Sequence, residues 1–145
     1  MLDRITPSHE VVDHTSEIRL RIRAGSLAEL LAEAGRALAR LELRGGQAAV
    51  TGDWRPLTVS AADRAGLLAE WLNELVFLAE AERWVPIEFE IGRAGESSTG
   101  ESAVWARARG VSVDQSPGLV KAATLHGLRV DAIPEGLEGE VVLDV

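Results

Sequence analysis

The side chains of this chain best suited to metal chemistry lie in a polar run at residues 13–17, Asp-His-Thr-Ser-Glu. The run contains two carboxylates, an imidazole and two hydroxyls, and carboxylate oxygens are preferred ligands of hard divalent cations. It stands directly before residues 18–23, whose strict alternation of apolar and polar residues is typical of a half-buried strand. Such side chains at the mouth of a rigid strand favour a metal site. The alternative is that Asp13, Thr15 and Ser16 satisfy a turn ahead of the strand.

Glu17 and Asp144 are the two carboxylates that the strand patterns place outside the core. The three isoleucine and leucine residues of 18–23 share one face of the strand, so Glu17 belongs to the opposite, exposed face. In the last expected strand, residues 140–145, Asp144 is opposite in parity to its apolar neighbours. Two carboxylates at strand ends are able to converge on a divalent cation. Spacing alone does not show that they do so. The alternative is that Asp144 is simply a solvated residue at the end of its strand.

Four further residues have a functional and a structural interpretation. The chain has fourteen Arg and one Lys, Lys121, a bias that indicates a GC-rich genome. Because such a bias favours Arg codons, the retained Lys121 is expected to be a site where a compact ammonium is useful. The alternative is that Lys121 is an exposed strand residue. His14 is expected to form hydrogen bonds that shape the polar run rather than to bind metal. Asp13 is expected to hydrogen-bond to a metal ligand and orient it without binding the metal itself. His126, an isolated histidine, is expected in a turn or in packing.

Length and composition limit the classes of protein that fit. With 145 residues, 46% of them hydrophobic, the chain is expected to form a single domain over residues 1–145. The net charge of −8 argues against direct binding of nucleic acid, which needs clustered basic residues. The absence of Cys excludes a disulfide scaffold, a thiolate metal site and a cysteine nucleophile. Without an apolar leader or membrane span, the sequence predicts a soluble, cytoplasmic protein.

The elements that must position these residues are two helices and six strands in the order β-α-β-α-β-β-β-β. This order predicts an α+β fold, a two-layer sandwich with two helices packed on one face of a largely antiparallel sheet. The first helix begins at a capping box, Ser26 with Glu29, and ends at Gly45-Gly46; its internal Gly35 predicts close packing against a sheet. The second helix has capping candidates at Ser60 and Asp63 and ends near Arg83. The remaining expectations are strands over 57–61, 87–91, 103–111 and 140–145, a flexible or hairpin connection over 92–102, and one or two strands over 120–130 with a bulge at Gly127.

Four segments in order resemble the archease family. Residues 13–18 are similar to its His-Thr-Ala-Asp-Ile string, residues 68–75 (Leu-Ala-Glu-Trp-Leu-Asn-Glu-Leu) to its helical Leu-x-x-Trp-Leu-Asn-Glu-Leu, and residues 120–128 to its Val-Lys-Ala-x-Thr-Tyr-His-Gly-Leu. Residues 142–145 match its hydrophobic-Asp-hydrophobic terminus. The resemblance runs from about Val12 to the last residue.

The resemblance implies a function and a set of site residues. Archeases are accessory proteins of the RtcB-type RNA ligase of tRNA splicing and RNA repair; they promote guanylylation of the ligase and its turnover without catalysing ligation. This chain would then contact RNA only indirectly, through the ligase. The family's divalent metal, expected to be calcium, falls on Glu17, Asp144 and the backbone carbonyl of Val145, and its functional lysine falls on Lys121. Glu17 stands where the family usually has Asp and Ser16 where it has Ala, so the site is interpreted as retuned, with decay as the alternative.

Two other functions compete with the archease interpretation. A general protein-binding chaperone or adaptor would use the helices and Trp residues to bind a different protein, with a retuned or vestigial metal site. A free-standing hydrolase would use His14 with Asp13 or Glu17 as base and metal ligand. The hydrolase ranks lowest because no nucleophile–base arrangement or phosphate-binding glycine motif is present.

Overall fold

The computed structural model describes residues 5–13, 16–46 and 49–145, which form seven strands and two helices. In chain order they are β1 (Ser8–Asp13), β2 (Glu17–Ala24), α1 (Leu27–Glu42), β3 (Thr51–Ala61), α2 (Arg64–Ala81), β4 (Trp84–Glu96), β5 (Ser102–Ser112), β6 (Ala122–Ile133) and β7 (Gly136–Asp144).

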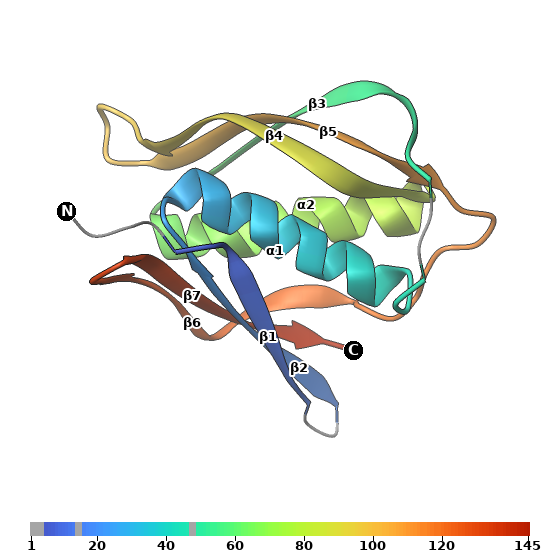
Figure 1. Ribbon diagram of the computed structural model, residues 1–145, viewed down its shortest axis with the longest axis horizontal. Coiled ribbons are helices and arrows are strands. Elements are labelled where there is room, and N and C mark those ends of the chain that lie inside the picture. Colours follow the sequence, from blue (N-terminus) through green and yellow to red (C-terminus); the bar gives the residue numbers. More distant parts are fainter. Residues whose placement is uncertain (1–4, 14–15, 47–48) are drawn as a thin grey trace.

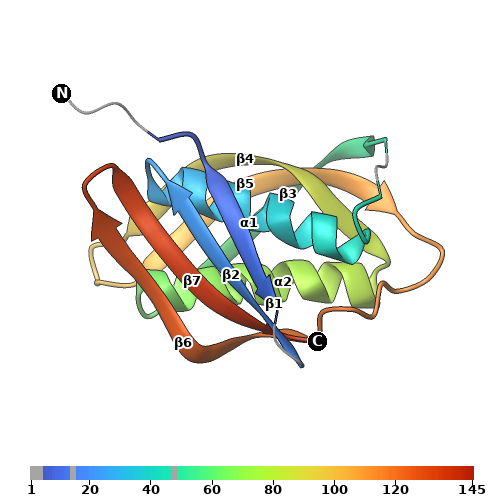
Figure 2. The ribbon, with the colours of Figure 1, turned by 60° about the horizontal axis from the view of Figure 1, so that its bottom comes forward.

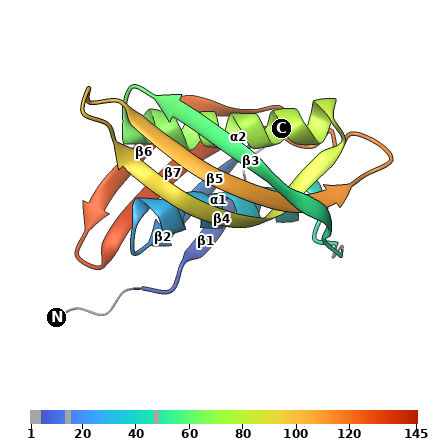
Figure 3. The ribbon, with the colours of Figure 1, turned by 90° about the horizontal axis from the view of Figure 1, so that it is seen from above.

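The strands form two antiparallel sheets with both helices between them (Figure 1). One sheet has the order β1-β2-β7-β6 and faces the viewer in Figure 2; the other has the order β3-β5-β4 and lies over the helices in Figure 3. Helix α1 contacts β4 and β2, and α2 contacts β6, β4 and β3. The α+β class, the two helices and the antiparallel pairing are therefore confirmed, but the layers number three where the sequence predicts two.

Helix α2 can serve two sheets because its apolar surface covers most of its circumference. Nine of its residues are buried, among them Trp71, which is fully enclosed and donates from its indole N–H to the Leu31 carbonyl at 2.8 Å. The Trp71 ring lies 5.8 Å from that of Phe89 on β4. Gly35 of α1 meets the same Phe89, since a Cβ at Gly35 would lie 2.6 Å from the phenylalanine Cζ. The predicted close packing of Gly35 against a sheet is confirmed.

The helix starts follow the sequence signals. Ser26 caps α1 by accepting from the Glu29 amide at 3.2 Å, and the Glu29 carboxylate reaches back to the Gly25 amide at 3.0 Å. Asp63 caps α2 by accepting from the Gly66 amide at 2.7 Å. The other capping candidate, Ser60, lies inside β3.

The strands are longer and one more numerous than the alternation predicts. β1 is an added strand that pairs with β2, β3 begins at Thr51, and β4 and β5 extend into the connection expected over 92–102. Backbone pairing continues through Gly and polar residues that carry no alternation, because the ladder needs only peptide groups. In β6 the register shifts between Thr124 and Arg129, and Gly127 has φ +69°, so the predicted irregularity at Gly127 is confirmed. In the described part of the chain, no helix is long and apolar enough to span a bilayer.

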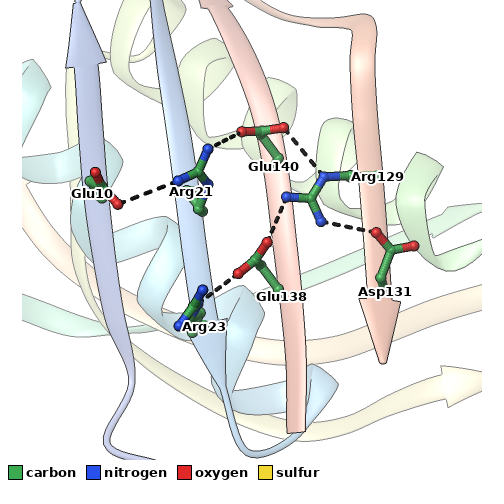
Figure 4. Close-up of polar contacts among 7 residues, drawn as sticks. All are labelled: Glu10, Arg21, Arg23, Arg129, Asp131, Glu138 and Glu140. Atoms are coloured by element: carbon green, nitrogen blue, oxygen red, sulfur yellow. Dashed lines mark hydrogen bonds and ion pairs between the residues drawn. The ribbon is translucent and has the colours of Figure 1, made fainter. Parts of the chain in front are cut away.

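Charged side chains cover the outer face of the four-stranded sheet as one network (Figure 4). Arg129 donates to Glu138 at 2.6 Å and to Glu140 at 3.3 Å, while Arg23 binds Glu138 at 2.6 Å and Arg21 binds Glu140 at 3.0 Å. The hydrogen bonds from Arg129 and Arg23 lower the pKa of Glu138. Burial would raise the pKa of Glu140, but Arg21 and Arg129 outweigh it and lower the value. The network also includes Asp131, at 2.9 Å from Arg129, and Glu10, at 3.7 Å from Arg21.

We expect Glu138→Gln to lower the free energy of unfolding at pH 7 by about 1–2 kcal/mol, because a largely buried carboxylate with two charged donors is lost. A carboxyl with a lowered folded-state pKa stabilises the protein above its unfolded pKa and loses that effect on acidification. Urea unfolding at pH 7 and pH 3 should therefore show a smaller pH difference for the variant. Glu10→Gln is the control: its 3.7 Å pair is exposed and should change little. Equal loss in the two variants would contradict the network's role.

Glu42, in the last turn of α1, has a buried carboxyl group that no hydrogen bond from the described residues satisfies. It is 4% exposed, and among the described residues neither of its carboxylate oxygens has a hydrogen-bond partner. Burial, reinforced by the nearby Glu80 carboxylate and opposed by Arg44, raises its pKa to about 7. Glu42 is therefore held protonated in mildly acidic solution and is forced to ionise inside the protein at higher pH.

A raised carboxyl pKa predicts that stability falls as pH rises from about 4.5 to about 7, because the unfolded chain releases its proton first. The loss is on the order of 3 kcal/mol if Glu42 alone is responsible. Glu42→Gln should remove this loss and be more stable than the parent at pH 7.5 in thermal unfolding. The exposed Glu70→Gln is the control and should retain the loss. A parent-like pH profile for Glu42→Gln would refute the assignment.

Candidate functional site

Glu17 and Asp144 face each other directly across the ladder between β2 and β7. Side chains directly opposite in an antiparallel pair project to the same face, with Cβ atoms about 4.5–5.5 Å apart. The next pair along, Ile18 and Leu143, packs in the core, so the two carboxylates belong to the outer face at one end of the sheet. Asp144 is exposed and Glu17 half-buried. The outward parity that the sequence predicts for both residues is confirmed.

Val145 and Lys121 reach the same end of the sheet through their backbones. The Val145 amide donates to the Ser16 carbonyl at 3.4 Å, which keeps the last residue beside the segment that precedes Glu17. The Lys121 amide donates to the Asp144 carbonyl at 2.8 Å, and the Lys121 side chain is exposed. Figure 2 shows the C-terminus beside the start of β2 and the chain entering β6. Three segments far apart in sequence therefore meet where the resemblance places the metal ligands and the lysine.

The other predicted residues are less closely defined. His14 lies outside the described residues. For Asp13 the structure describes the backbone, which ends β1 opposite Ile18, and its part in the site stays a prediction. His126 is exposed on β6, in the stretch where the register shifts, so it lies neither in a turn nor in the core packing that the sequence predicts for it.

The donors at this sheet end suit a hard divalent cation. Two side-chain carboxylates and a backbone carbonyl are all oxygen ligands, the type that Ca²⁺ binds at 2.3–2.6 Å in sets of about six to eight. Within residues 5–13, 16–46 and 49–145 no cluster of three or more His, Cys, Asp or Glu side chains is arranged to hold a metal. A cation between Glu17 and Asp144 would therefore complete its coordination with backbone oxygens and water. The residues fit such an ion in chemistry, with only two side-chain ligands.

Asn73 of α2 is a contributor that sequence reasoning overlooked. Its side-chain carbonyl accepts from the Ala123 amide at 2.7 Å, and its side-chain NH₂ donates to the Ala123 carbonyl at 3.2 Å. Ala123 is the second residue of β6, two positions after Lys121. A signal was present, since Asn73 lies in the helical string that resembles the archease motif.

The four Trp residues divide between the core and the other sheet. Trp71 and Trp84 are buried. Trp54 and Trp105 lie on β3 and β5, where Trp105 is 41% exposed with Arg93 stacked 4.3 Å above its ring. Arg107 and Arg109 stack on Trp54 at 4.8 and 4.7 Å. Exposed Trp and Arg are typical of protein interfaces, so this surface bears on the adaptor alternative.

The chain is similar in sequence and in fold to known proteins over nearly its whole length. The chain is 28% identical over 142 residues to the protein archease of Methanosarcina barkeri, covering 94% of this chain and 95% of the relative. It is 27% identical, with the same coverage, to the protein archease of Methanosarcina acetivorans. The solution structure of protein 1598 of Methanobacterium thermoautotrophicum has the same fold, with a TM-score of 0.70, 22% identity, and coverage of 94% of this chain and 98% of that one.

The model of the archease protein family matches residues 9–145, from the second residue of β1 to the last residue of the chain. The match includes all four segments in which the sequence resembles that family, and the ladders between β2, β7 and β6 bring three of them to one end of a sheet. The chain belongs to the archease family.

Proposed function

We propose that this chain is a metal-binding accessory protein of an RtcB-type RNA ligase, which promotes guanylylation of the ligase and its turnover in tRNA splicing and RNA repair. Membership of the archease family supports the proposal. The observation that carries it is the meeting of Glu17, Asp144 and Lys121 at one sheet end, through the Glu17–Asp144 pair and the Lys121–Asp144 backbone hydrogen bond. The protein acts in the cytoplasm and contacts RNA only through the ligase.

Each residue has a separate part in the proposed site. The carboxylates of Glu17 and Asp144 and the carbonyl of Val145 hold the cation, with calcium as the proposed ion. When bound, the cation supplies a concentrated positive charge for partner carboxylates or nucleotide phosphates. Lys121 adds an exposed ammonium two residues before Asn73's contact point, and its backbone ties it to the metal ligand Asp144. The covalent chemistry takes place on the ligase, so this chain is an activator and not the enzyme.

Glu17 is the one departure from the family's ligand set. Its extra methylene moves the carboxylate by roughly 1.5 Å relative to Asp. Because Glu17 lies directly opposite Asp144 in the ladder, its longer side chain can still bring its carboxylate to a cation bound by Asp144. Asp144 and Lys121 are both retained, which favours a retuned site over a decaying one.

Terbium luminescence and calcium titration test the metal site in the isolated protein. Glu17→Gln and Asp144→Asn should each weaken binding by about tenfold or more, because each removes the charge of one of the two side-chain ligands. Glu10→Gln, which removes a carboxylate elsewhere on the same face, should bind as the parent does. Glu17→Asp distinguishes the two interpretations: a retuned site binds this variant no better than the parent, whereas a decayed site gains affinity. Equal binding by all variants would refute the site.

A guanylylation assay with the purified ligase from the same organism tests the function. The parent protein should raise both the rate of ligase guanylylation and the number of turnovers. Asp144→Ala should abolish the gain, and Lys121→Ala should reduce it while leaving metal affinity near that of the parent. No stimulation by the parent protein would overturn the proposal.

The adaptor function remains the second candidate because of the Trp and Arg side chains on the three-stranded sheet. Trp105, with Arg93 above it, lines one wall of a hollow of about 460 Å³ shared with Pro56 and Thr58. An adaptor that uses this surface should lose its partner in pull-down with Trp105→Ala and keep it with Asp144→Ala. The ligase activator should show the reverse sensitivity.

A further inference from the structure

The segment that brings Lys121 to the site has little regular structure of its own. Residues 113–121, between β5 and β6, form no strand. Glu80 of helix α2 holds the middle of this segment with two hydrogen bonds. Its side chain accepts from the Gly118 amide at 2.7 Å, and its backbone carbonyl accepts from the Ser116 hydroxyl at 2.6 Å. Two helical turns earlier, Asn73 holds Ala123. Lys121 therefore lies between two attachments to one helix.

The start of β6 depends on such attachment because its ladder there is short. β6 pairs with β7 at only three residues, Ala122 to Thr124, before the register shifts at the irregular stretch that contains Gly127. Regular pairing resumes at Arg129. A three-residue ladder at the edge of a sheet gives weak cooperative support. One of its three pairs is Ala122 with Asp144, so a slip of this ladder would move Lys121 relative to the carboxylate of the site.

Asn73 supplies what a further strand would supply at this edge. Ala123 is buried on the core side, and Asn73 satisfies both its N–H and its C=O, the two groups that a neighbouring strand would bind. Only an amide side chain offers a donor and an acceptor in one plane at this length. Asp would keep the acceptor and lose the donor, and Leu would lose both. Asn is a poor helix former, so its position within α2 fits a side chain required for this contact.

We propose that Asn73 is the positioning residue of the site, fixing the first three residues of β6 so that Lys121 and Asp144 are presented together. The inference rests on the proposed function for its consequence in ligase activation. Its structural content, the ordering of Lys121 by Asn73, is independent of the ligase.

Hydrogen exchange of the isolated protein tests that structural content. In Asn73→Ala the amides of Lys121 and Ala123 should exchange about tenfold faster or more than in the parent, because the start of β6 opens locally, while the amides of β5 stay unchanged. Asn73→Asp should show an intermediate effect on Ala123, since it keeps the acceptor. Val104→Ala, a core truncation on β5, is the control for general destabilisation and should not open β6 selectively. Parent-like protection of Lys121 and Ala123 in Asn73→Ala would overturn the proposal.

The consequence for activation is measured with the same ligase assay. Asn73→Ala should lower the maximal stimulation about tenfold or more, with a smaller change in the concentration that gives half-maximal stimulation, because the site is disordered while the rest of the surface is kept. Val104→Ala should retain the maximal stimulation at a temperature where circular dichroism shows both variants folded. An equal loss in the two variants, or none in Asn73→Ala, refutes the positioning role. If the parent fails to stimulate the ligase, the proposed function fails, and hydrogen exchange still decides whether Asn73 orders Lys121.

Discussion

The ladder between β2 and β7 is the interaction on which the rest of the molecule depends. It pairs eight residues from Glu17 to Ala24 with eight from Leu137 to Asp144, so the second and the last strand form the centre of one sheet. Its inner face contributes Leu20, Ile22 and Leu143 to the core. Its outer face contributes four members of the charged network, Arg21, Arg23, Glu138 and Glu140 (Figure 4). Its last pair is Glu17 with Asp144. The same register therefore fixes the packing, the network and the candidate site, because a one-residue slip would turn every side chain to the wrong face.

The helices connect this sheet to the other parts of the structure. α2 lies in the middle layer and packs against both sheets with its apolar surface. Its side chains Asn73 and Glu80 hold the start of β6 and the segment before it. A helix that is hydrophobic over most of its circumference is stable only when it is covered on several sides. The same helix therefore supports the core and the proposed site. Asn73, which contacts the start of β6, lies within one turn of the buried Trp71 and Leu75.

Two buried or nearly buried carboxylates show how strongly environment decides their role. Glu138 is bound by Arg129 and Arg23, and these bonds lower its pKa. Glu42 has no such donors among the described residues, and burial raises its pKa to about 7. One therefore stabilises the fold when ionised, and the other when protonated. Burial alone does not decide the sign of the effect; the availability of charged donors does.

The sequence by itself determined the two helices, their caps at Ser26 and Asp63, and the outward parity of Glu17 and Asp144, and it suggested the residues of the candidate site. Caps and alternation are local signals: Ser26 and Asp63 act on amides three residues away, and Glu17 is set by its neighbours in one strand. The resemblance to the archease family added Val145 and the pairing of Glu17 with Asp144 as an expectation. Only the tertiary structure decided that the strands divide into two sheets, that Glu17 lies directly opposite Asp144, and that Asn73 reaches Ala123. These depend on contacts between residues 50 to more than 120 positions apart, and no local periodicity encodes which strand pairs with which or what a buried amide will bind.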